Sequence, residues 1–400
     1  MTKIPPQALL ACLLMFCAGL ADGVLVPFLP LWATGEAHVP VALVGLLFGC
    51  YAGGELLAAP FVGGIADRVG RRVVLIASSL GVGAGIAALF FVHGWLAAAG
   101  VLLVTGLFES VLHPTIMAVI ADVIPQEGHR RWFSVAVVAS GVGHVVGPLL
   151  GALVAMTSLK QVFLVAGAPL FVGGLVVALF LAETAHGING EGDDDEEEEG
   201  LSALAPIFRD RRLAMLLVWV VAFEVVGNWV QAVLPIYMRD AGTLGASGVG
   251  VLFAGSAAVM AVLQLVVTRV TEQRPASSLT FVAGVATLIA FAVLSASASL
   301  PAAIIALGLV SLAHMLVGPL VPTAVSALSP PHRRASYMAA SSVAVDLKDS
   351  LAPAMGTALY ALSPVLPWFI GMPVVMAAAL GLGRMVSGQE ASRASALPQE

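Results

Sequence analysis

The sequence predicts an all-α integral membrane protein in which twelve transmembrane helices form two homologous six-helix bundles. Three observations support this fold class. Of the 400 residues, 59% are hydrophobic and only 10% are charged, whereas soluble domains carry roughly 25% charged residues. Apolar runs of about 20 residues, the length that crosses a bilayer, recur along the chain. The pattern of the first half also returns in the second half at a fixed shift of 205 residues.

Hydropathy places the helices in order. The first run lacks a small-residue cleavage site and is followed by eleven more, so we interpret it as a spanning helix and not as a signal peptide. The twelve expected helices cover residues 7–33, 41–65, 73–92, 97–123, 133–155, 160–182, 213–238, 246–269, 277–298, 300–328, 335–361 and 364–386.

The distribution of basic residues predicts the orientation. Lys and Arg in short loops remain on the cytoplasmic side of a membrane. With the N-terminus inside, fifteen of the 18 basic residues lie on that side, Lys160 and Arg239 lie outside, and Lys348 lies within a helix. We therefore expect a multi-pass protein of the bacterial inner membrane with both termini in the cytoplasm.

An acidic segment separates the two halves. Eight acids lie between Glu191 and Glu199, and such a block repels itself and buries no apolar surface, so we interpret it as a disordered linker. The expected organisation is an N-terminal bundle at 1–182, a cytoplasmic linker at 183–212, a C-terminal bundle at 213–386 and a cytoplasmic tail at 387–400.

The two halves match residue by residue. Pro148 and Gly151 correspond to Pro353 and Gly356 at the shift of 205 residues, and the Leu-Pro pair at 29–30 corresponds to that at 234–235. One register held over more than a hundred residues indicates an internal duplication. Membrane transporters built from such repeats often bind substrate near the bilayer midplane, between the repeats.

The loop GGIADRVGRR, at 63–72, concentrates charge between two apolar runs. With twelve helices and a central linker, it resembles the loop between helices 2 and 3 of the major facilitator superfamily, which reads close to G-x-L-A-D-R-x-G-R-R. The resemblance covers nearly the whole chain and implies a cytoplasmic gate with a charge lock of Asp67 and Arg71, for which Asp122 at the end of helix 4 is a candidate partner. The gate residues are Gly63, Asp67, Arg68, Gly70, Arg71, Arg72 and Asp122. The alternative is that these arginines only set the topology.

A second motif lies in helix 5. The stretch GVGHVVGPLLG, with Gly143, Gly147, Pro148 and Gly151, is similar to the G-x-x-x-G-P-x-x-G pattern of the drug:proton antiporter branch of that family. Small residues four apart allow close helix packing and Pro bends a helix. The alternative is generic helix packing.

One position departs from that branch. Its helix 4 usually carries an arginine about eleven residues before the proline that is here Pro114, but position 103 is Leu. The helix carries Glu109 and His113 instead, which puts direct transfer of the branch's proton-coupling scheme in doubt.

Ionisable residues inside the helices are candidates for proton coupling or substrate binding. A charge at the helix centre costs about 2.5–3.5 kcal/mol on insertion scales, so it is usually paired or functional. The resemblance implies that helices 1, 4, 7 and 10 line the cavity, which favours Asp22, Glu109 and Glu224. The full set of candidates is Asp22, Glu55, Glu109, His113, Glu224, Trp229, Gln231, Asp346, Lys348 and Asp349. Structural pairing within the helices remains the alternative for each of them.

These features predict a monomeric secondary active transporter that exports organic cations or amphipathic drugs in exchange for protons. An excess of intramembrane acids favours cationic cargo. The expected partners are a small-molecule substrate, protons and the lipid bilayer, without nucleic acid. Two alternatives stay open: a transporter dedicated to one metabolite or siderophore, and a non-transporting sensor or assembly protein.

No enzymatic activity is expected, because the sequence contains no nucleotide loop, nucleophile or metal constellation. The cysteines Cys12, Cys17 and Cys50 lie within predicted helices without ligand spacing. We therefore expect no cofactor and no metal site.

Overall fold

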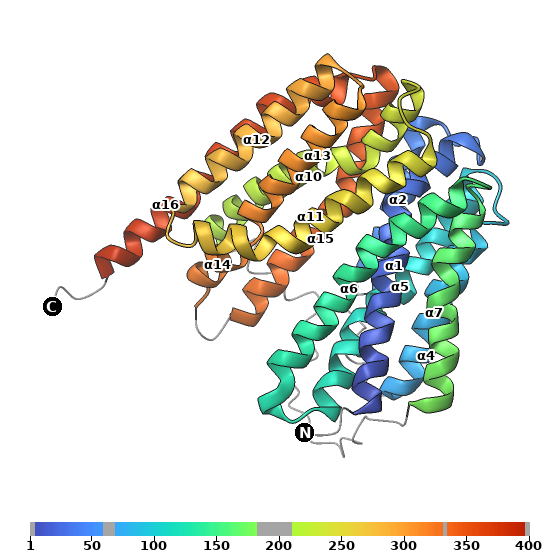
Figure 1. The fold of residues 1–400 in the computed structure, drawn as a ribbon. Helices are drawn as coiled ribbons and strands as arrows, with labels where there is room; N and C mark the ends of the chain where they lie inside the picture. The colour runs from blue at the N-terminus through green and yellow to red at the C-terminus, as the bar shows by residue number, and fades with distance from the viewer. Residues whose placement is uncertain (1–4, 59–68, 182–209, 331–333, 397–400) are drawn as a thin grey trace. The chain divides into compact units, whose positions relative to one another are not determined.

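The computed structural model describes residues 5–58, 69–181, 210–330 and 334–396, and these residues are helical apart from short connections (Figure 1). Contacts divide the chain into two compact units. Unit 1 comprises Met1–Glu197 and Leu244–Ala258, and unit 2 comprises Glu198–Thr243 and Val259–Glu400.

Six helices lie among the described residues up to 181, and unit 1 is built mainly from them. They are α1 (Pro6–Gly35), α2 (Val41–Ala58), α4 (Arg71–Ala88), α5 (Trp95–Val123), α6 (Gln126–Ala155) and α7 (Gln161–Phe180). Helix α1 packs against α5, α6 and α7, and α2 packs against α5. In α1, 67% of the residues in its apolar 18-residue stretch are buried, so this helix supplies much of the interior of the unit.

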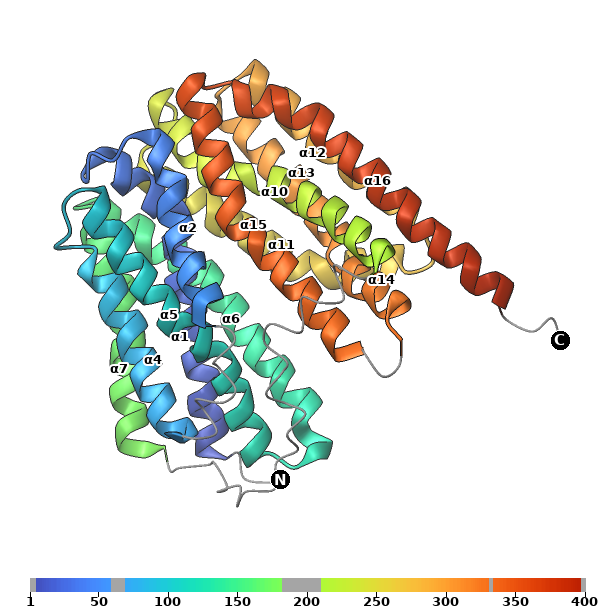
Figure 2. The same ribbon diagram turned by 180° about the vertical axis from the view of Figure 1, so that it is seen from behind.

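The described residues from 210 onward form seven helices. They are α10 (Arg211–Asp240), α11 (Ala246–Thr271), α12 (Ala276–Ala296), α13 (Leu300–Val317), α14 (Leu320–Leu328), α15 (Arg334–Leu362) and α16 (Leu366–Ala396). Helix α10 packs against α15, α16 and α13, and Figure 2 shows α15 and α10 side by side. In α10, too, 67% of the residues in its apolar 18-residue stretch are buried. The first helix of each half therefore supplies much of the interior of its bundle.

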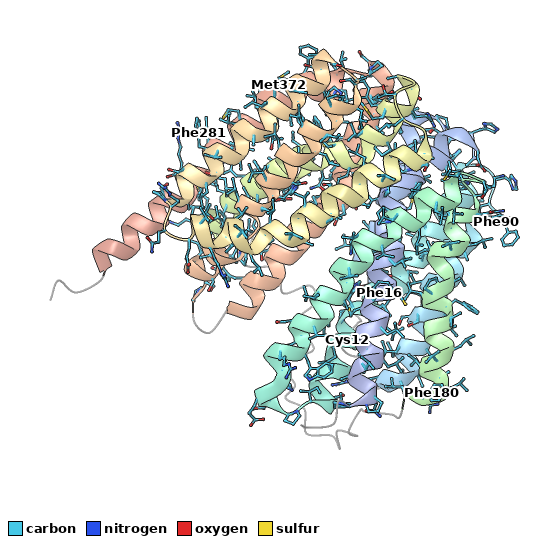
Figure 3. The ribbon with its side chains drawn as sticks, in the orientation of Figure 1. Cys12, Phe16, Phe90, Phe180, Phe281 and Met372 are labelled. Carbon is cyan, nitrogen blue, oxygen red and sulfur yellow. The ribbon has the colours of Figure 1, made fainter. Side chains whose placement is uncertain are left out.

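Eleven spans among the described residues are long and apolar enough to cross a membrane, with α13 and α14 counted together. Helix α15 is the twelfth long helix, and it carries Lys348 and Asp349 near its middle. The outer surfaces are apolar: Phe180 and Phe281 are 73% and 49% exposed (Figure 3). Exposed apolar surface of this extent suits a bilayer as solvent. The fold class expected from the sequence is therefore confirmed.

Three boundaries differ most from the sequence expectation. Helix α6 begins at Gln126, seven residues before the expected start at 133. The single helix expected at 300–328 is interrupted between Val317 and Leu320, because Pro319 has no backbone N–H to continue the ladder. Helix α16 continues to Ala396, ten residues beyond the expected end at 386, because the added residues include good helix formers such as Ala, Glu, Gln and Arg.

Candidate functional site

Unit 1 contains a polar cluster between α1 and α5. Glu109 is only 5% exposed, and its Oε1 lies 3.1 Å from Nδ1 of His113, one turn further along α5. Asp22 comes from α1, and one possible ligand atom from each of the three side chains lies within 4.8 Å of the others. Among the described residues, this is the group of acids and histidine that could hold a cation. Two carboxylates and one imidazole in apolar surroundings can also exchange protons.

Helix α2 contributes to the same region. The hydroxyl of Tyr51 is buried and has no hydrogen-bond partner among the described residues, and it interacts electrostatically with Glu109, Asp22 and Glu55. Glu55, on the same helix as Tyr51, also interacts electrostatically with His113. The structure therefore brings together four of the residues expected from the sequence, and it adds Tyr51.

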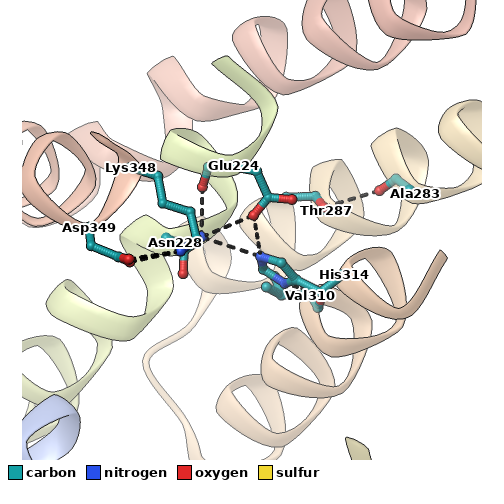
Figure 4. Close-up of polar contacts among 8 residues, drawn as sticks. All are labelled: Glu224, Asn228, Ala283, Thr287, Val310, His314, Lys348 and Asp349. Carbon is teal, nitrogen blue, oxygen red and sulfur yellow. Dashed lines mark hydrogen bonds and ion pairs between the residues drawn. The ribbon is translucent and has the colours of Figure 1, made fainter. Parts of the chain in front are cut away.

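Unit 2 contains a second polar cluster, shown in Figure 4. Oε2 of Glu224 on α10 lies 3.4 Å from Nε2 of His314 on α13. The amide nitrogen of Asn228, one turn after Glu224, lies 3.4 Å from the same Nε2. Lys348 on α15 acts electrostatically on both Glu224 and His314, while its ammonium group lies 2.9 Å from Oδ1 of Asp349.

The sequence reasoning missed His314 and Asn228. The signal for His314 was present in the repeat, because position 314 is the counterpart of Glu109 at the shift of 205 residues. Asn228 carries no such signal. It is an uncharged residue in a long apolar helix, and only the contact between helices identifies its role.

The remaining intramembrane candidates lie as follows. The indole of Trp229 is 1% exposed and packs against Gly356 of α15. Gln231 is partly exposed on α10, and the Asp349 side chain is 54% exposed beside Lys348. Asp346 lies on α15, but its side chain is among those that the structure does not describe.

At the start of α4, two arginines of the gate motif connect three helices. Arg71 forms an ion pair with Asp122 and donates a 2.9 Å hydrogen bond to the carbonyl of Ala118, both on α5. Arg72 donates a 2.6 Å hydrogen bond to the carbonyl of Ala178 on α7. Cations near helix C-termini are stabilised by the exposed carbonyls. The start of α4 is thus fixed to the ends of α5 and α7.

Gly70 precedes α4 with φ of 97°, a conformation that favours glycine. It therefore allows the sharp entry into that helix. The other gate residues, Gly63, Asp67 and Arg68, lie outside the described residues.

The glycines of the helix 5 motif lie on α6 and form a close contact with α1. A Cβ atom at Gly143 would overlap the carbonyl oxygen of Phe16, and one at Gly147 would overlap that of Leu20. Gly151 faces the ring of Phe28 in the same way. The motif therefore brings the two helix backbones together at successive turns, as small residues four apart permit.

Unit 2 has polar contacts at both ends of the α10–α15 pair. Tyr337 donates a 2.9 Å hydrogen bond to Asp210, the N-cap of α10, and Tyr360 donates one of 2.9 Å to Asp240 at its last residue. The two helices therefore run parallel and are joined at each end.

The cap at Asp210 gives a prediction on pH. Burial raises the pKa of this carboxyl group, but hydrogen bonds from Tyr337 and from the amides of Arg212 and Leu213 outweigh it, so the pKa is lowered. A lowered pKa in the folded state gives stability that is present above the ordinary Asp pKa of about 4 and is lost as pH falls through the folded value.

We therefore expect Asp210→Ala to lower the free energy of unfolding in detergent by about 0.5–2 kcal/mol at pH 7, the usual range for an N-cap. The difference from the wild type should be smaller at pH 3 than at pH 7 in thermal unfolding, because the carboxyl group begins to bind a proton below its ordinary pKa. An equal deficit at both pH values would show that the carboxylate is not the source of the effect.

The family comparison matches residues 11–353 to the Major Facilitator Superfamily. The chain is 30% identical over 198 residues to the class E tetracycline resistance protein of Escherichia coli, covering 48% of this chain and 47% of that protein. It is 26% identical over 296 residues to the class G protein of Vibrio anguillarum, covering 70% of this chain and 71% of that one. The chain thus spans about half the length of the first of these relatives.

A further relative is the multidrug resistance protein MdtG of Enterobacter lignolyticus, 26% identical over 56% of this chain and 54% of that protein. Among solved structures, the nucleoside transporter NupG has a TM-score of 0.79 at 12% identity, covering 97% of this chain and 99% of that one. A bacterial homologue of the lysosomal transporter Spinster has a TM-score of 0.75 at 16% identity, covering 98% of each chain. At these identities the structural likeness concerns the fold alone.

Proposed function

We propose that this chain, which belongs to the Major Facilitator Superfamily, exports organic cations or amphipathic drugs in exchange for protons. Membership of this family makes it a multi-pass membrane transporter of small molecules and not an enzyme. The observation that carries this proposal is the cluster of Asp22, Glu109 and His113. The similarity to tetracycline and multidrug resistance proteins supports export of drug-like cargo.

The mechanism we propose is competition between proton and cargo for the same acids. Ionised Asp22 and Glu109 attract a cation, since charge is poorly screened in apolar surroundings. When these carboxyl groups bind protons, the attraction is lost and the cation leaves. His113 lies within reach of Glu109 and passes a proton to or from it. External protons thereby displace cargo, and their release inside resets the site.

We further propose that the chain acts as a monomer in a bacterial cytoplasmic membrane with both termini inside. The support is the placement of basic residues described above. In this orientation the start of α4 and the end of α5, with Arg71 and Asp122, face the cytoplasm.

Neutralising this pair tests its part in the transport cycle. The pair contributes about 1.5 kcal/mol in the conformation that contains it if it resembles other charged hydrogen bonds. We therefore expect Asp122→Asn to shift the conformational balance about tenfold and to slow transport, with cargo affinity unchanged. Initial transport rates and equilibrium binding separate the two quantities.

The charge-swapped double variant Arg71→Asp with Asp122→Arg is the matched control, and it should recover part of the rate. A large loss of cargo affinity in Asp122→Asn would exclude a gating role for this pair.

The proposed activity is tested in energised inverted membrane vesicles with a pH-sensitive dye. The panel contains the cations tetraphenylphosphonium and ethidium, together with neutral and anionic compounds. It also contains tetracycline, because relatives of this chain are named tetracycline resistance proteins. Proton release should follow addition of cationic or amphipathic cargo, and Asp22→Asn should abolish it. Release with anions alone, or with no member of the panel, would contradict the proposal.

A further inference from the structure

We propose that Glu224, Asn228 and His314 form a second proton-binding site, lying wholly within unit 2, in which Glu224 and His314 share a single exchangeable proton. This inference deepens the proposed function, on which its role in transport rests. The proton-binding step itself requires neither cargo nor a membrane gradient.

Hydrogen bonding fixes one hydrogen on the imidazole ring. Nδ1 of His314 lies 2.9 Å from the carbonyl oxygen of Val310. A carbonyl oxygen only accepts, so Nδ1 carries a hydrogen in either charge state of the ring. The other ring nitrogen, Nε2, is therefore the atom that gains or loses a proton.

The orientation of Asn228 is also fixed. Its Nδ2 lies 2.9 Å from the backbone carbonyl of Glu224, so the atom at this position must be a donor. The second hydrogen on Nδ2 is directed to Oε2 of Glu224 at 3.5 Å and to Nε2 of His314 at 3.4 Å. Asn228 therefore donates to Oε2 of Glu224 in either state of the pair, and to Nε2 of His314 while that nitrogen carries no hydrogen.

One more hydrogen completes this arrangement. Oε2 and Nε2 are 3.4 Å apart, and without a proton between them two lone pairs face each other in buried surroundings. With one proton, either group donates to the other and the contact becomes a charge-assisted or neutral hydrogen bond. A second proton would have to bind outside this contact, on Oε1 of Glu224, because the space between Oε2 and Nε2 holds one hydrogen. The geometry therefore suits one proton for the pair.

The charged groups around the pair decide when that proton leaves. Helix α15 supplies Lys348, which acts on both Glu224 and His314, and Asp349, which pairs with Lys348. From α12, the side chain of Thr287 near Glu224 is uncharged (Figure 4). Because the ammonium of Lys348 favours an ionised Glu224 and an uncharged imidazole, it opposes retention of the proton.

The internal repeat supports the assignment independently. His314 is the counterpart of Glu109, and the counterpart of Glu224 is Gly19, three residues before Asp22 on α1. Each half thus places an acid on its first helix close to a histidine on its fourth: Asp22 and His113 in unit 1, and Glu224 and His314 in unit 2. A site that recurs in both halves is better explained by a shared role than by chance packing of a buried histidine.

The test is potentiometric titration of purified protein in weakly buffered detergent between pH 8 and pH 5, without cargo. Glu224→Gln and His314→Asn should each reduce proton uptake by the same amount, about one proton per chain, and the double variant should lose no more than either single variant. Glu109→Gln serves as the comparison, because its loss should add to that of the unit 2 variants.

Two results would overturn the inference. Uptake unchanged in both single variants would show that the pair does not exchange a proton in this range. A loss in the double variant equal to the sum of the single losses would show two independent groups. Size-exclusion profiles and the conservative variant His314→Gln distinguish proton loss from misfolding. Because no cargo is present, failure of the proposed transport activity would leave this measurement interpretable.

Discussion

Glu109→Gln is expected to reduce proton-driven transport to the level of vesicles that lack the protein. The side chain is 5% exposed and lies 3.1 Å from His113 and close to Asp22. An amide of the same shape preserves packing, but it removes both the charge that attracts a cation and the group that binds the proton. Uptake of tetraphenylphosphonium into energised inverted vesicles measures the effect, and Asp22→Asn should behave alike.

The matched control for this prediction is Glu127→Gln. Glu127 is exposed in the first turn of α6, outside the cluster, and its replacement makes the same chemical change. Transport in this variant should equal that of the wild type. Full activity of both Glu109→Gln and Asp22→Asn would remove the unit 1 cluster from the transport mechanism.

Gly143→Ala is expected to destabilise the protein by about 1–3 kcal/mol, the usual cost of overpacking a close contact. A Cβ atom at this position meets the Phe16 carbonyl and the Leu20 amide on α1, and backbone atoms cannot rotate away. The variant should show a lower unfolding temperature in detergent and a lower yield of monodisperse protein.

A glycine two residues earlier provides the control. Gly141 lies on the same helix and a Cβ atom there has no neighbour within 4 Å. Gly141→Ala should therefore be neutral, or stabilising by up to about 1 kcal/mol through helix propensity. Equal unfolding temperatures for the two variants would contradict a close contact between α1 and α6.

Much of the fold could be predicted because the hydropathy of a short stretch of sequence is enough to identify a spanning helix. A run of about 20 apolar residues must cross the bilayer as a helix, since its backbone polar groups have no other partners there. The break near Pro319 was less evident because the flanking residues remain apolar, so the hydropathy of 300–328 continues across it. The continuation of α16 to Ala396 was missed because hydropathy does not detect a polar helix.

The candidate sites were partly predictable for a related reason. Acids such as Asp22 and Glu109 stand out in apolar helices because burying a charge is costly. Their partners depend on how helices pack: Glu224 and His314 are ninety residues apart, and only the contact between α10 and α13 pairs them. Tyr51 was missed because a tyrosine is uncharged at neutral pH, so it does not stand out in an apolar helix as an acid does. Its importance depends on a buried hydroxyl group near acids on other helices.

The most direct test is equilibrium binding of tetraphenylphosphonium to the purified protein as a function of pH, with proton release recorded in weak buffer. Competition for the same acids requires that binding release protons. It also requires that the apparent affinity for tetraphenylphosphonium fall as the pH is lowered. Once the pH is below the pKa of the acids, this affinity should fall by up to about tenfold for each pH unit. Both effects should disappear in Glu109→Gln. Binding that is independent of pH and releases no protons would contradict competition between proton and cargo.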